Sequence, residues 1–350
     1  MNGRSAVTLS DVAQRAGVSL ATASRVINGS ERAVSPRYRD RVLTAAADLG
    51  YLPNAHAQAM ALGRSKMIGL LVHDISDPYF SAIASGAVSL VEARGLLVLG
   101  NTLHRREYEL EYVTAMRVQR AQALILVGSR TTDAAHTRRL AAELAEFTAS
   151  GGRVAAVSQN RLGTDTVLPE NRPGARALAE ALVGQGFRRF TVLGGPRTLV
   201  AARDRVRGFQ DGLAAHGVAP PRVIEGAFTR DGGHEVTSDL NDLPECLFAV
   251  NDVMALGSMA ALRERGLRVP DDIAVAGFDD IPTLRDVAPS LTTIRLPLAE
   301  MGRLAASMVL GDERRLRPRV ARISGDVILR DSTHRAPGGF GTSRCAPTGP

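Results

Sequence analysis

Residues 20–27 could present a helical face whose side chains hydrogen-bond a nucleic acid. A helix over this segment turns Ala23, Val26 and Ile27 inward. Its outward face then carries two apolar side chains, two hydroxyls and one guanidinium, namely Leu20, Ala21, Thr22, Ser24 and Arg25. Hydroxyls and arginines suit phosphate oxygens, and an arginine can also donate two hydrogen bonds to the edge of a guanine. This face therefore predicts contact with the backbone and bases of DNA.

Three predicted helices hold this face in place. The first begins at Thr8, where Asp11 completes a capping-box pattern, and it ends at Gly17. Ser19 can cap the second helix, and Ser35 followed by Pro36 opens the third. The third helix is expected to bury a stripe formed by Val42, Leu43, Ala46 and Leu49. Two helices joined by a short turn with glycine are typical of a helix-turn-helix, although a plain three-helix bundle is the alternative.

From residue 67 onward the pattern changes to apolar runs separated by segments of helix length. The first four runs cover 67–72, 96–100, 123–128 and 154–158, and three more follow later. This alternation predicts parallel sheets with helices on both faces, and such sheets bind ligands beyond the carboxyl ends of their strands. Polar residues gather directly after the runs: Asp74, Ser76, Asp77, Asn101, Thr102, Ser158, Gln159, Asn251, Asp252, Asp279 and Asp280.

Many short motifs, in this order, resemble those of the LacI/GalR family of bacterial transcriptional repressors. The N-terminal ones are DVAQRAGVS, TASRVING, VSP and LGYLPN, which leads into an alanine-rich stretch. Later ones include GLLVHDISDPYF, NRPGARALAEAL, RVRGF, AVNDVMALG, DDIAVAGFDD, LTTIRLP and LRDST, so the resemblance extends over residues 6–333. It implies an all-α helix-turn-helix DNA-binding domain with a hinge helix, followed by a two-lobed α/β effector domain similar to periplasmic-binding proteins of type I.

The resemblance also implies an order of domains along the chain. Residues 1–52 would form the helix-turn-helix domain, 53–66 the hinge helix and linker, and 67–333 the two-lobed effector-binding and dimerisation domain. The lobe near DNA would take 67–162 and 292–325, and the far lobe 165–288. Residues 334–350 are rich in glycine and proline and lack a leucine heptad. They are expected to form a disordered tail, which favours a dimer over a tetramer.

For the helix-turn-helix, the resemblance places Leu20, Ala21 and Arg25 at base-reading positions. Arg25 is the one side chain among them able to make a bidentate contact to guanine. Further DNA contacts, mainly to phosphates, would come from Thr8, Leu9, Ser19, Thr22, Ser24 and Asn28.

The predicted hinge helix would enter the minor groove. Asn54 can cap it, and Ala57 fits the position at which two paired hinge helices pack closely. The family's wedge residue, usually leucine, is Met60 here. A methionine can still part a base step, but it is more flexible, so a softer kink in the DNA is expected.

For the effector, the resemblance places cleft contacts at Arg205, Asn251 and Asp279, with further contacts from Ser76, Tyr79, Phe80 and Gln159. An arginine fork and an aspartate that accepts two hydroxyls suit a polyhydroxylated ligand or a nucleobase. Many sugar-responsive members carry an acid where this chain has Gln159. Each position also has a structural alternative: Arg205 as a surface arginine, Asn251 as an N-cap, and Asp279 with Asp280 as caps of a following helix.

Charge is concentrated at the N-terminal end. The chain has 43 Lys and Arg against 36 Asp and Glu, a net charge of +7. Residues 1–66 hold nine of these cations and four of the acids and thus carry +5, whereas 67–333 is neutral. A basic head on a neutral body is the footprint of phosphate binding by the head alone, although a merely solvated basic face is the simpler alternative.

Other classes of protein find little support in the sequence. Lys66 is the only lysine, so a phosphate loop with lysine is ruled out, and neither HExxH nor GxSxG occurs. The two cysteines, Cys246 and Cys345, predict neither a disulfide framework nor a metal site. The absence of a long apolar stretch and of a signal peptide predicts a cytoplasmic protein without membrane contact.

The sequence thus predicts a regulator of transcription that is not an enzyme and needs no cofactor. We expect a homodimer that binds double-stranded, pseudo-palindromic operator DNA as a repressor, with a sugar or sugar derivative as allosteric effector in the inter-lobe cleft. Two alternatives stay open. One is a co-repressor-dependent regulator that responds to a nucleobase or a phosphorylated metabolite, and the other is a sugar-binding transport protein.

Overall fold

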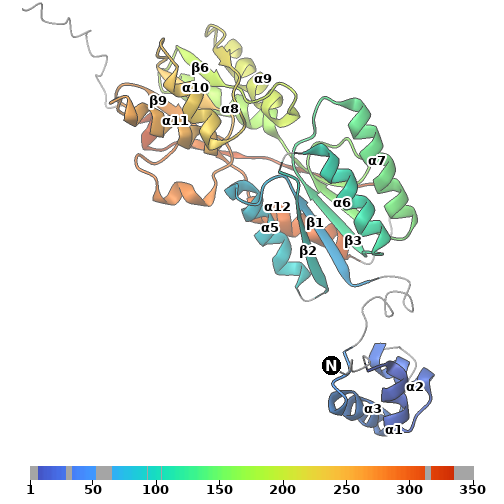
Figure 1. The fold of residues 1–350 in the computed structure, drawn as a ribbon. Helices are drawn as coiled ribbons and strands as arrows, with labels where there is room; N and C mark the ends of the chain where they lie inside the picture. The colour runs from blue at the N-terminus through green and yellow to red at the C-terminus, as the bar shows by residue number, and fades with distance from the viewer. Residues whose placement is uncertain are drawn as a thin grey trace, which may run out of the picture. The chain divides into compact units, whose positions relative to one another are not determined.

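The computed structural model describes residues 7–28, 34–52, 65–92, 94–103, 105–311 and 317–334. The chain divides into two compact units, a helical one at the N-terminus and a larger one that begins at Met67 (Figure 1). The predicted hinge helix with Asn54, Ala57 and Met60 lies outside the described residues, as does the predicted tail from residue 335 onward.

The N-terminal unit consists of α1 (Leu9–Ala16), α2 (Leu20–Asn28) and α3 (Pro36–Asp48). At the start of α1, the Thr8 backbone N–H donates to Asp11 Oδ2 over 2.8 Å and the Asp11 N–H donates to Thr8 Oγ1 over 3.3 Å. Gly17 ends the helix with φ +61°, a left-handed conformation that glycine adopts without steric cost. The predicted capping box and the predicted end of this helix are therefore confirmed.

A small apolar core joins these three helices. It buries Val12, Ala13, Ala16, Ala23, Val42 and Ala45. The predicted stripe of α3 is wrong at Leu43, whose exposed fraction is 46%. Ala45 is buried instead, because the buried face of α3 is centred on Val42 and the residues three and four positions further on, whereas Leu43 lies a further 100° around the helix.

The larger unit begins with a six-stranded parallel sheet in the order β11-β5-β4-β3-β1-β2. Its strands are β1 (Met67–Val72), β2 (Leu96–Asn101), β3 (Ala123–Val127), β4 (Arg153–Val157), β5 (Asp165–Pro169) and β11 (Val320–Ile323). The central strand β3 is buried along its whole length, as expected of a parallel strand covered on both faces. We refer to this sheet and its helices as the first lobe.

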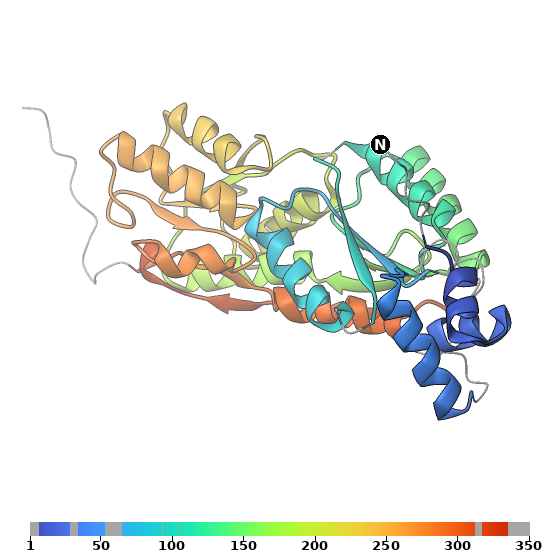
Figure 2. The same ribbon diagram turned by 60° about the horizontal axis from the view of Figure 1, so that its bottom comes forward.

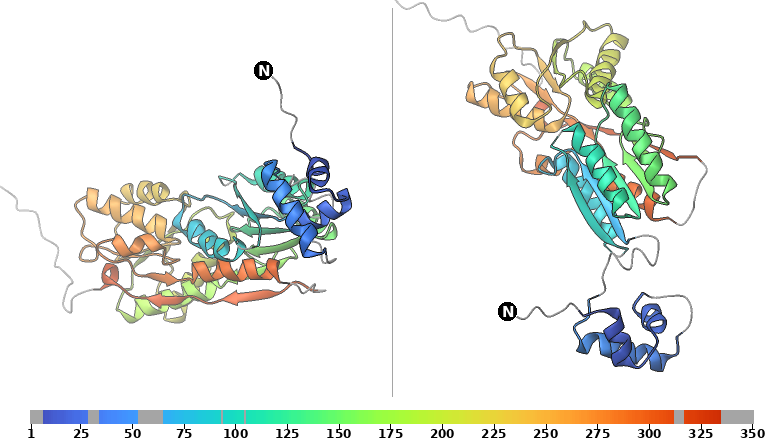
Figure 3. Two further views of the ribbon diagram at one scale, coloured as in Figure 1. Left: turned by 90° about the horizontal axis from the view of Figure 1, so that it is seen from below. Right: turned by 45° about the vertical axis from the view of Figure 1, so that its right-hand side comes forward.

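Helices cover both faces of the first sheet. α5 (Pro78–Val91) and α12 (Leu298–Leu310) lie side by side, although about 200 residues of chain separate them (Figure 3). Gly86 lets their backbones touch, because a Cβ atom there would overlap the carbonyl of Ala299. α6 (Arg106–Val118) packs against α7 (Ala134–Ala149) on the opposite face (Figure 1).

The second lobe is a four-stranded parallel sheet in the order β7-β6-β8-β9. Its strands are β6 (Phe190–Leu193), β7 (Arg222–Ile224), β8 (Cys246–Ala249) and β9 (Ala274–Ala276). One helix pair is α8 (Asn171–Gly184) with α9 (Val200–Ala215), the other is α10 (Arg230–Ser238) with α11 (Asp252–Glu264), and a 3₁₀ turn spans Pro282–Asp286. No helix among the described residues is long and apolar enough to cross a bilayer.

The chain passes between the lobes through β10 (Thr293–Arg295) and β12 (Asp326–Ile328), which pair antiparallel. Its last described turn, Asp331–Thr333, packs against β9 of the second lobe, so the late part of the chain contributes to both lobes (Figure 2). The predicted start of the far lobe at residue 165 is too early. β5 is bonded to β4 and β11 of the first sheet, and the second lobe begins only after Pro169.

Candidate functional site

The exposed face of α2 carries the side chains predicted to read bases. Leu20 is 54% exposed, and Ala21 and Arg25 are exposed as well. The neighbouring hydroxyls are organised locally. Ser19 Oγ accepts the Thr22 N–H over 3.2 Å, and the Ser24 hydroxyl accepts from Asn28 over 3.0 Å.

Two further residues predicted to contact DNA lie at the start of α1. Thr8 is exposed while it serves in the capping box, whereas Leu9 is half-buried and packs against the apolar core of the unit. Leu9 thus has a clear packing role, and its proposed contact with DNA can involve only part of its side chain.

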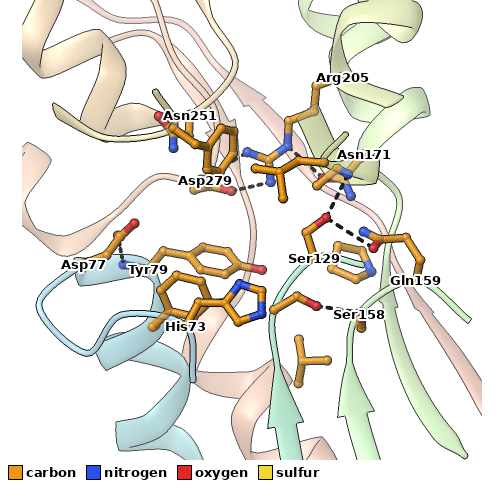
Figure 4. Close-up of a pocket in the computed structure, with 17 residues that line it drawn as sticks. His73, Asp77, Tyr79, Ser129, Ser158, Gln159, Asn171, Arg205, Asn251 and Asp279 are labelled. Atoms are coloured by element: carbon orange, nitrogen blue, oxygen red, sulfur yellow. Dashed lines mark hydrogen bonds and ion pairs between the residues drawn. The ribbon is translucent and has the colours of Figure 1, made fainter. Parts of the chain in front are cut away.

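A cavity opens between the two lobes of the larger unit (Figure 4). Its empty volume, measured out to bulk solvent, is about 590 Å³. Six of the seven predicted effector residues line it together: Tyr79, Phe80, Gln159, Arg205, Asn251 and Asp279. The polar ends of β1, β3 and β4 meet those of β8 and β9 here, because each lobe turns the carboxyl edge of its parallel sheet toward the other.

Arg205 of α9 is the centre of the second-lobe wall. Its guanidinium donates to both oxygens of Asp279, over 2.8 and 3.2 Å, to Asn171 Oδ1 over 2.8 Å and to the Val250 carbonyl over 2.7 Å. The guanidinium carbon also lies 3.9 Å from the centre of the Phe278 ring. Burial raises the pKa of Asp279 above its usual range, and the charge of Arg205 opposes that rise. The alternative of a surface arginine is therefore wrong.

Helix capping was the structural alternative for both Asn251 and Asp279, and it holds for Asn251 alone. Asn251 is the N-cap of α11, where its Oδ1 accepts the Met254 N–H over 2.9 Å, and it lines the cavity as well. Asp279 caps no helix, because it is occupied by Arg205, and the 3₁₀ turn that follows has Ile281 at its N-cap position.

Tyr79, Phe80 and Gln159 form part of the first-lobe wall. The two rings meet edge to face with centroids 5.1 Å apart, and burial raises the pKa of the Tyr79 hydroxyl above its usual range. Gln159 Oε1 accepts the Arg130 N–H over 2.7 Å, which leaves its Nε2 as a donor.

Ser76 is not brought to this cavity. Its N–H and Oγ both donate to Asp74 Oδ1, over 2.9 and 2.7 Å. It lines a separate hollow with Asp74, Asp77 and Asp231. The Asx-type turn after β1 thus directs Ser76 away from the other predicted effector residues.

A buried ion cluster that was not predicted from the sequence lies behind the first-lobe wall. Arg130 donates to both oxygens of Glu109, over 2.7 and 3.1 Å, while His136 Nε2 lies 3.0 Å and His73 Nε2 3.7 Å from the same carboxylate. Burial alone would raise the pKa of Glu109, but the two histidines and Arg130 hold it well below its usual range. Arg130 follows an apolar run, a signal that could have found it, whereas nothing local marks Glu109.

Asn171 was also missed as a cleft residue. It lies just after β5 and at the start of α8, where it accepts from Arg205 and lines the cavity. The rule that polar residues follow strands would have selected it. No group of three or more His, Cys, Asp or Glu side chains that could hold a metal ion occurs in the part of the chain that the structure describes.

A helix-turn-helix with an exposed polar face, carried by the same chain as a two-lobed domain with a polar cleft, defines the class of ligand-responsive DNA-binding regulators. Comparison with known proteins gives the family. Residues 8–54 match the model of bacterial regulatory proteins of the lacI family, and residues 179–333 match the periplasmic binding protein-like domain. The chain is 36% identical to the transcriptional regulator GalS of Salmonella typhimurium, over 87% of this chain and 89% of GalS.

Solved structures agree with this assignment. A Lac repressor dimer bound to operator and the anti-inducer ONPF has a TM-score of 0.77 at 27% identity, covering 94% of this chain and 99% of that one. A complex of the transcriptional regulator CelR with cellobiose has a TM-score of 0.66 at 27% identity, covering 93% and 99%. The chain belongs to the LacI family and is a DNA-binding regulator of transcription, which confirms the predicted family and fold class.

Proposed function

We propose that this regulator is a repressor that binds a pseudo-palindromic operator as a homodimer and is controlled by a sugar-like molecule in the inter-lobe cleft. The observation that carries the proposal is the cavity, which combines aromatic rings with both donors and acceptors. Tyr79, Phe80 and Phe228 offer apolar surface, while Gln159 and Asn171 offer amide groups. A polyhydroxylated ring with one apolar face suits such walls. CelR, a similar protein, was solved with the disaccharide cellobiose.

The homodimer has independent support in an apolar edge of the first lobe. β2 is an edge strand of the six-stranded sheet, and Leu96 and Leu99 on it are 64% and 47% exposed. Leu90 of α5 and Leu103 after β2 are exposed nearby in the sequence. An exposed apolar edge strand is rare in monomeric proteins, because it invites pairing with another chain. The similar Lac repressor structure is a dimer on its operator.

We further infer that the chain is not an enzyme and that it acts in the cytoplasm, where bacterial DNA is. Its relatives are regulators of transcription. The cleft contains two buried ion pairs, Arg205 with Asp279 and Arg130 with Glu109. Neither pair contains a nucleophile next to a base.

The test of DNA recognition starts from a pool of random-sequence duplexes, from which the protein selects its sites. We expect an inverted repeat, and we expect Arg25→Ala to lower affinity for it about 5- to 150-fold, the effect of about 1–3 kcal/mol for a lost bidentate contact. Arg207→Ala, which removes an exposed arginine of the second lobe, is the matched control and should bind as the wild type does. Selection of unrelated or unrepeated sequences, or equal behaviour of the two variants, would contradict the proposal.

A further inference from the structure

A second pocket continues the cleft on the side of α6 and α7. It shares His73, Ser129, Leu199 and Phe228 with the first cavity, so that the two are neighbouring parts of one space. Its empty volume out to bulk solvent is about 980 Å³. A ligand held in the first cavity could therefore extend into the second without leaving the protein.

Cations dominate the wall of this second pocket. Its lining includes Arg105, Arg106 and Arg130 but a single acid, Glu109, which Arg130 already holds with two hydrogen bonds. Arg106 donates to Asp133 over 2.9 Å, at a side chain that is 39% exposed and thus still reaches solvent. Arg105 is exposed, and its guanidinium lies 4.4 Å from the centre of the Tyr108 ring, an aromatic platform that orients the cation without cancelling its charge.

Further hydrogen-bond donors line the wall of the second pocket. His136 and His73, at either side of Glu109, line the pocket along with hydroxyls from both lobes. The buried hydroxyl of Thr102, also on this wall, has no hydrogen-bond partner among the described residues. The group that fits this wall accepts several hydrogen bonds and carries negative charge.

A neighbouring hollow has the opposite sign. This hollow contains Ser76 and borders the second pocket at Phe228 and Thr229. It is lined by Asp74, Asp77 and Asp231 against one cation, Arg230, which is paired with Asp231 over 2.8 Å. Acids in one hollow and arginines in the next orient a ligand whose charge lies at one end, because an anionic end is repelled by the first and attracted by the second.

We propose that the effector carries an anionic group, a phosphate or a carboxylate, which Arg105 and Arg106 bind in the second pocket while its polyhydroxylated part occupies the first. Arginine forks bind both kinds of oxyanion with paired hydrogen bonds. This inference rests on the proposed function, because it takes the inter-lobe cleft as the effector site.

The first test needs no knowledge of the effector. The Tm of the full-length protein is measured in inorganic phosphate and in chloride at equal ionic strength, for the wild type, Arg105→Gln/Arg106→Gln and Arg207→Gln. Phosphate should stabilise the wild type and the exposed-arginine control Arg207→Gln, and the double variant should lose most of that shift. An equal shift in all three proteins, or no shift in any, would overturn the inference.

The second test distinguishes this inference from the proposed function. Calorimetry compares matched triplets, such as galactose, galactose 6-phosphate and galacturonate, or glucose, glucose 6-phosphate and glucuronate. An anionic member should bind at least tenfold tighter than its neutral parent, and Arg105→Gln/Arg106→Gln should abolish that preference. A neutral sugar that binds best and alters operator affinity would refute the anionic group but leave the proposed function intact. Anions that bind through the two arginines without changing operator affinity would confirm the oxyanion site but refute the effector role that the proposed function gives to the cleft.

Discussion

Breaking the ion pair in the second-lobe wall should cost far more than losing an ordinary arginine. Arg205→Met keeps most of the side-chain volume but removes every donor of a guanidinium that is 3% exposed. The change strands the Asp279 carboxylate, Asn171 Oδ1 and the Val250 carbonyl. Removing one partner of a buried ion pair typically costs about 3–5 kcal/mol, because the other charge is left without compensation.

The surroundings of the ion pair decide where its cost falls within this range of free energies. Asn171 and Asp279 both line the cavity, so water can replace part of what the guanidinium supplied. We therefore expect the lower part of the range, about 3 kcal/mol, for Arg205→Met. Replacing both partners, as Arg205→Met/Asp279→Asn, should cost less than the sum of the two single changes, since no charge then remains buried alone.

The assay is the urea-induced unfolding of the larger unit, followed by circular dichroism, for the two single variants and the double variant. Arg207→Met, an exposed arginine two positions further along α9, controls for the loss of charge and should change the free energy of unfolding by less than about 0.5 kcal/mol. If Arg205→Met is as mild as Arg207→Met, or if the costs simply add, the pair does not stabilise the wall as argued.

Two further predictions concern a buried carboxyl and the apolar edge. Burial raises the pKa of Asp252 to about 6, so the folded chain binds a proton at this carboxyl more tightly than the unfolded chain does. The contribution of Asp252 to the free energy of unfolding should therefore fall by about 3 kcal/mol as the pH rises from about 4 to about 6. Asp252→Asn can still accept the Ile281 N–H and hydrogen-bond Thr293. Unfolding curves of this variant and of the wild type are compared between pH 4 and 7, and the variant should lack the fall due to Asp252. Parallel pH profiles of the two proteins would disprove the raised pKa of Asp252. Leu99→Asp should convert the proposed dimer into a monomer in light scattering, while Val118→Asp, at a more exposed apolar site of the same lobe, should not; an unchanged mass for both would place the interface elsewhere.

The cleft residues could be predicted from sequence because parallel strands carry the residues that follow them to one edge. Gln159, Asn251 and Asp279 each come just after an apolar run, and the structure brings all three to one cavity. The cap at Thr8 could be predicted because both of its hydrogen bonds link residues three positions apart.

What the sequence could not predict depends on pairings between distant segments. β5 belongs to the first lobe because it pairs with β11, which lies about 150 residues further along the chain. Glu109 lies on α6 and Arg130 follows β3, so the two meet only through the tertiary fold, and neither residue carries a local sign of the other. Ser76 follows a strand as its neighbours do, but its hydroxyl donates to Asp74, two positions earlier, and Ser76 lies in the acidic hollow instead of the first cavity.

The neighbouring carboxylates Asp279 and Asp280 connect the cleft to the segments that join the lobes. Asp279 accepts from Arg205 in the cavity wall, whereas Asp280 accepts from Arg295 of β10 over 2.6 Å and from Arg330, just after β12, over 2.7 Å. Both residues have positive φ, +122° and +55°, a conformation that costs non-glycine residues about 1–3 kcal/mol each and persists only where the surroundings enforce it. A ligand that competes for Asp279 or Arg205 therefore acts on a strained dipeptide. The second residue of this dipeptide, Asp280, holds the segments around β10 and β12 that join the lobes. An effector can control DNA binding only if its affinity differs between two arrangements of the lobes, and this dipeptide is where contacts in the cleft would distinguish them.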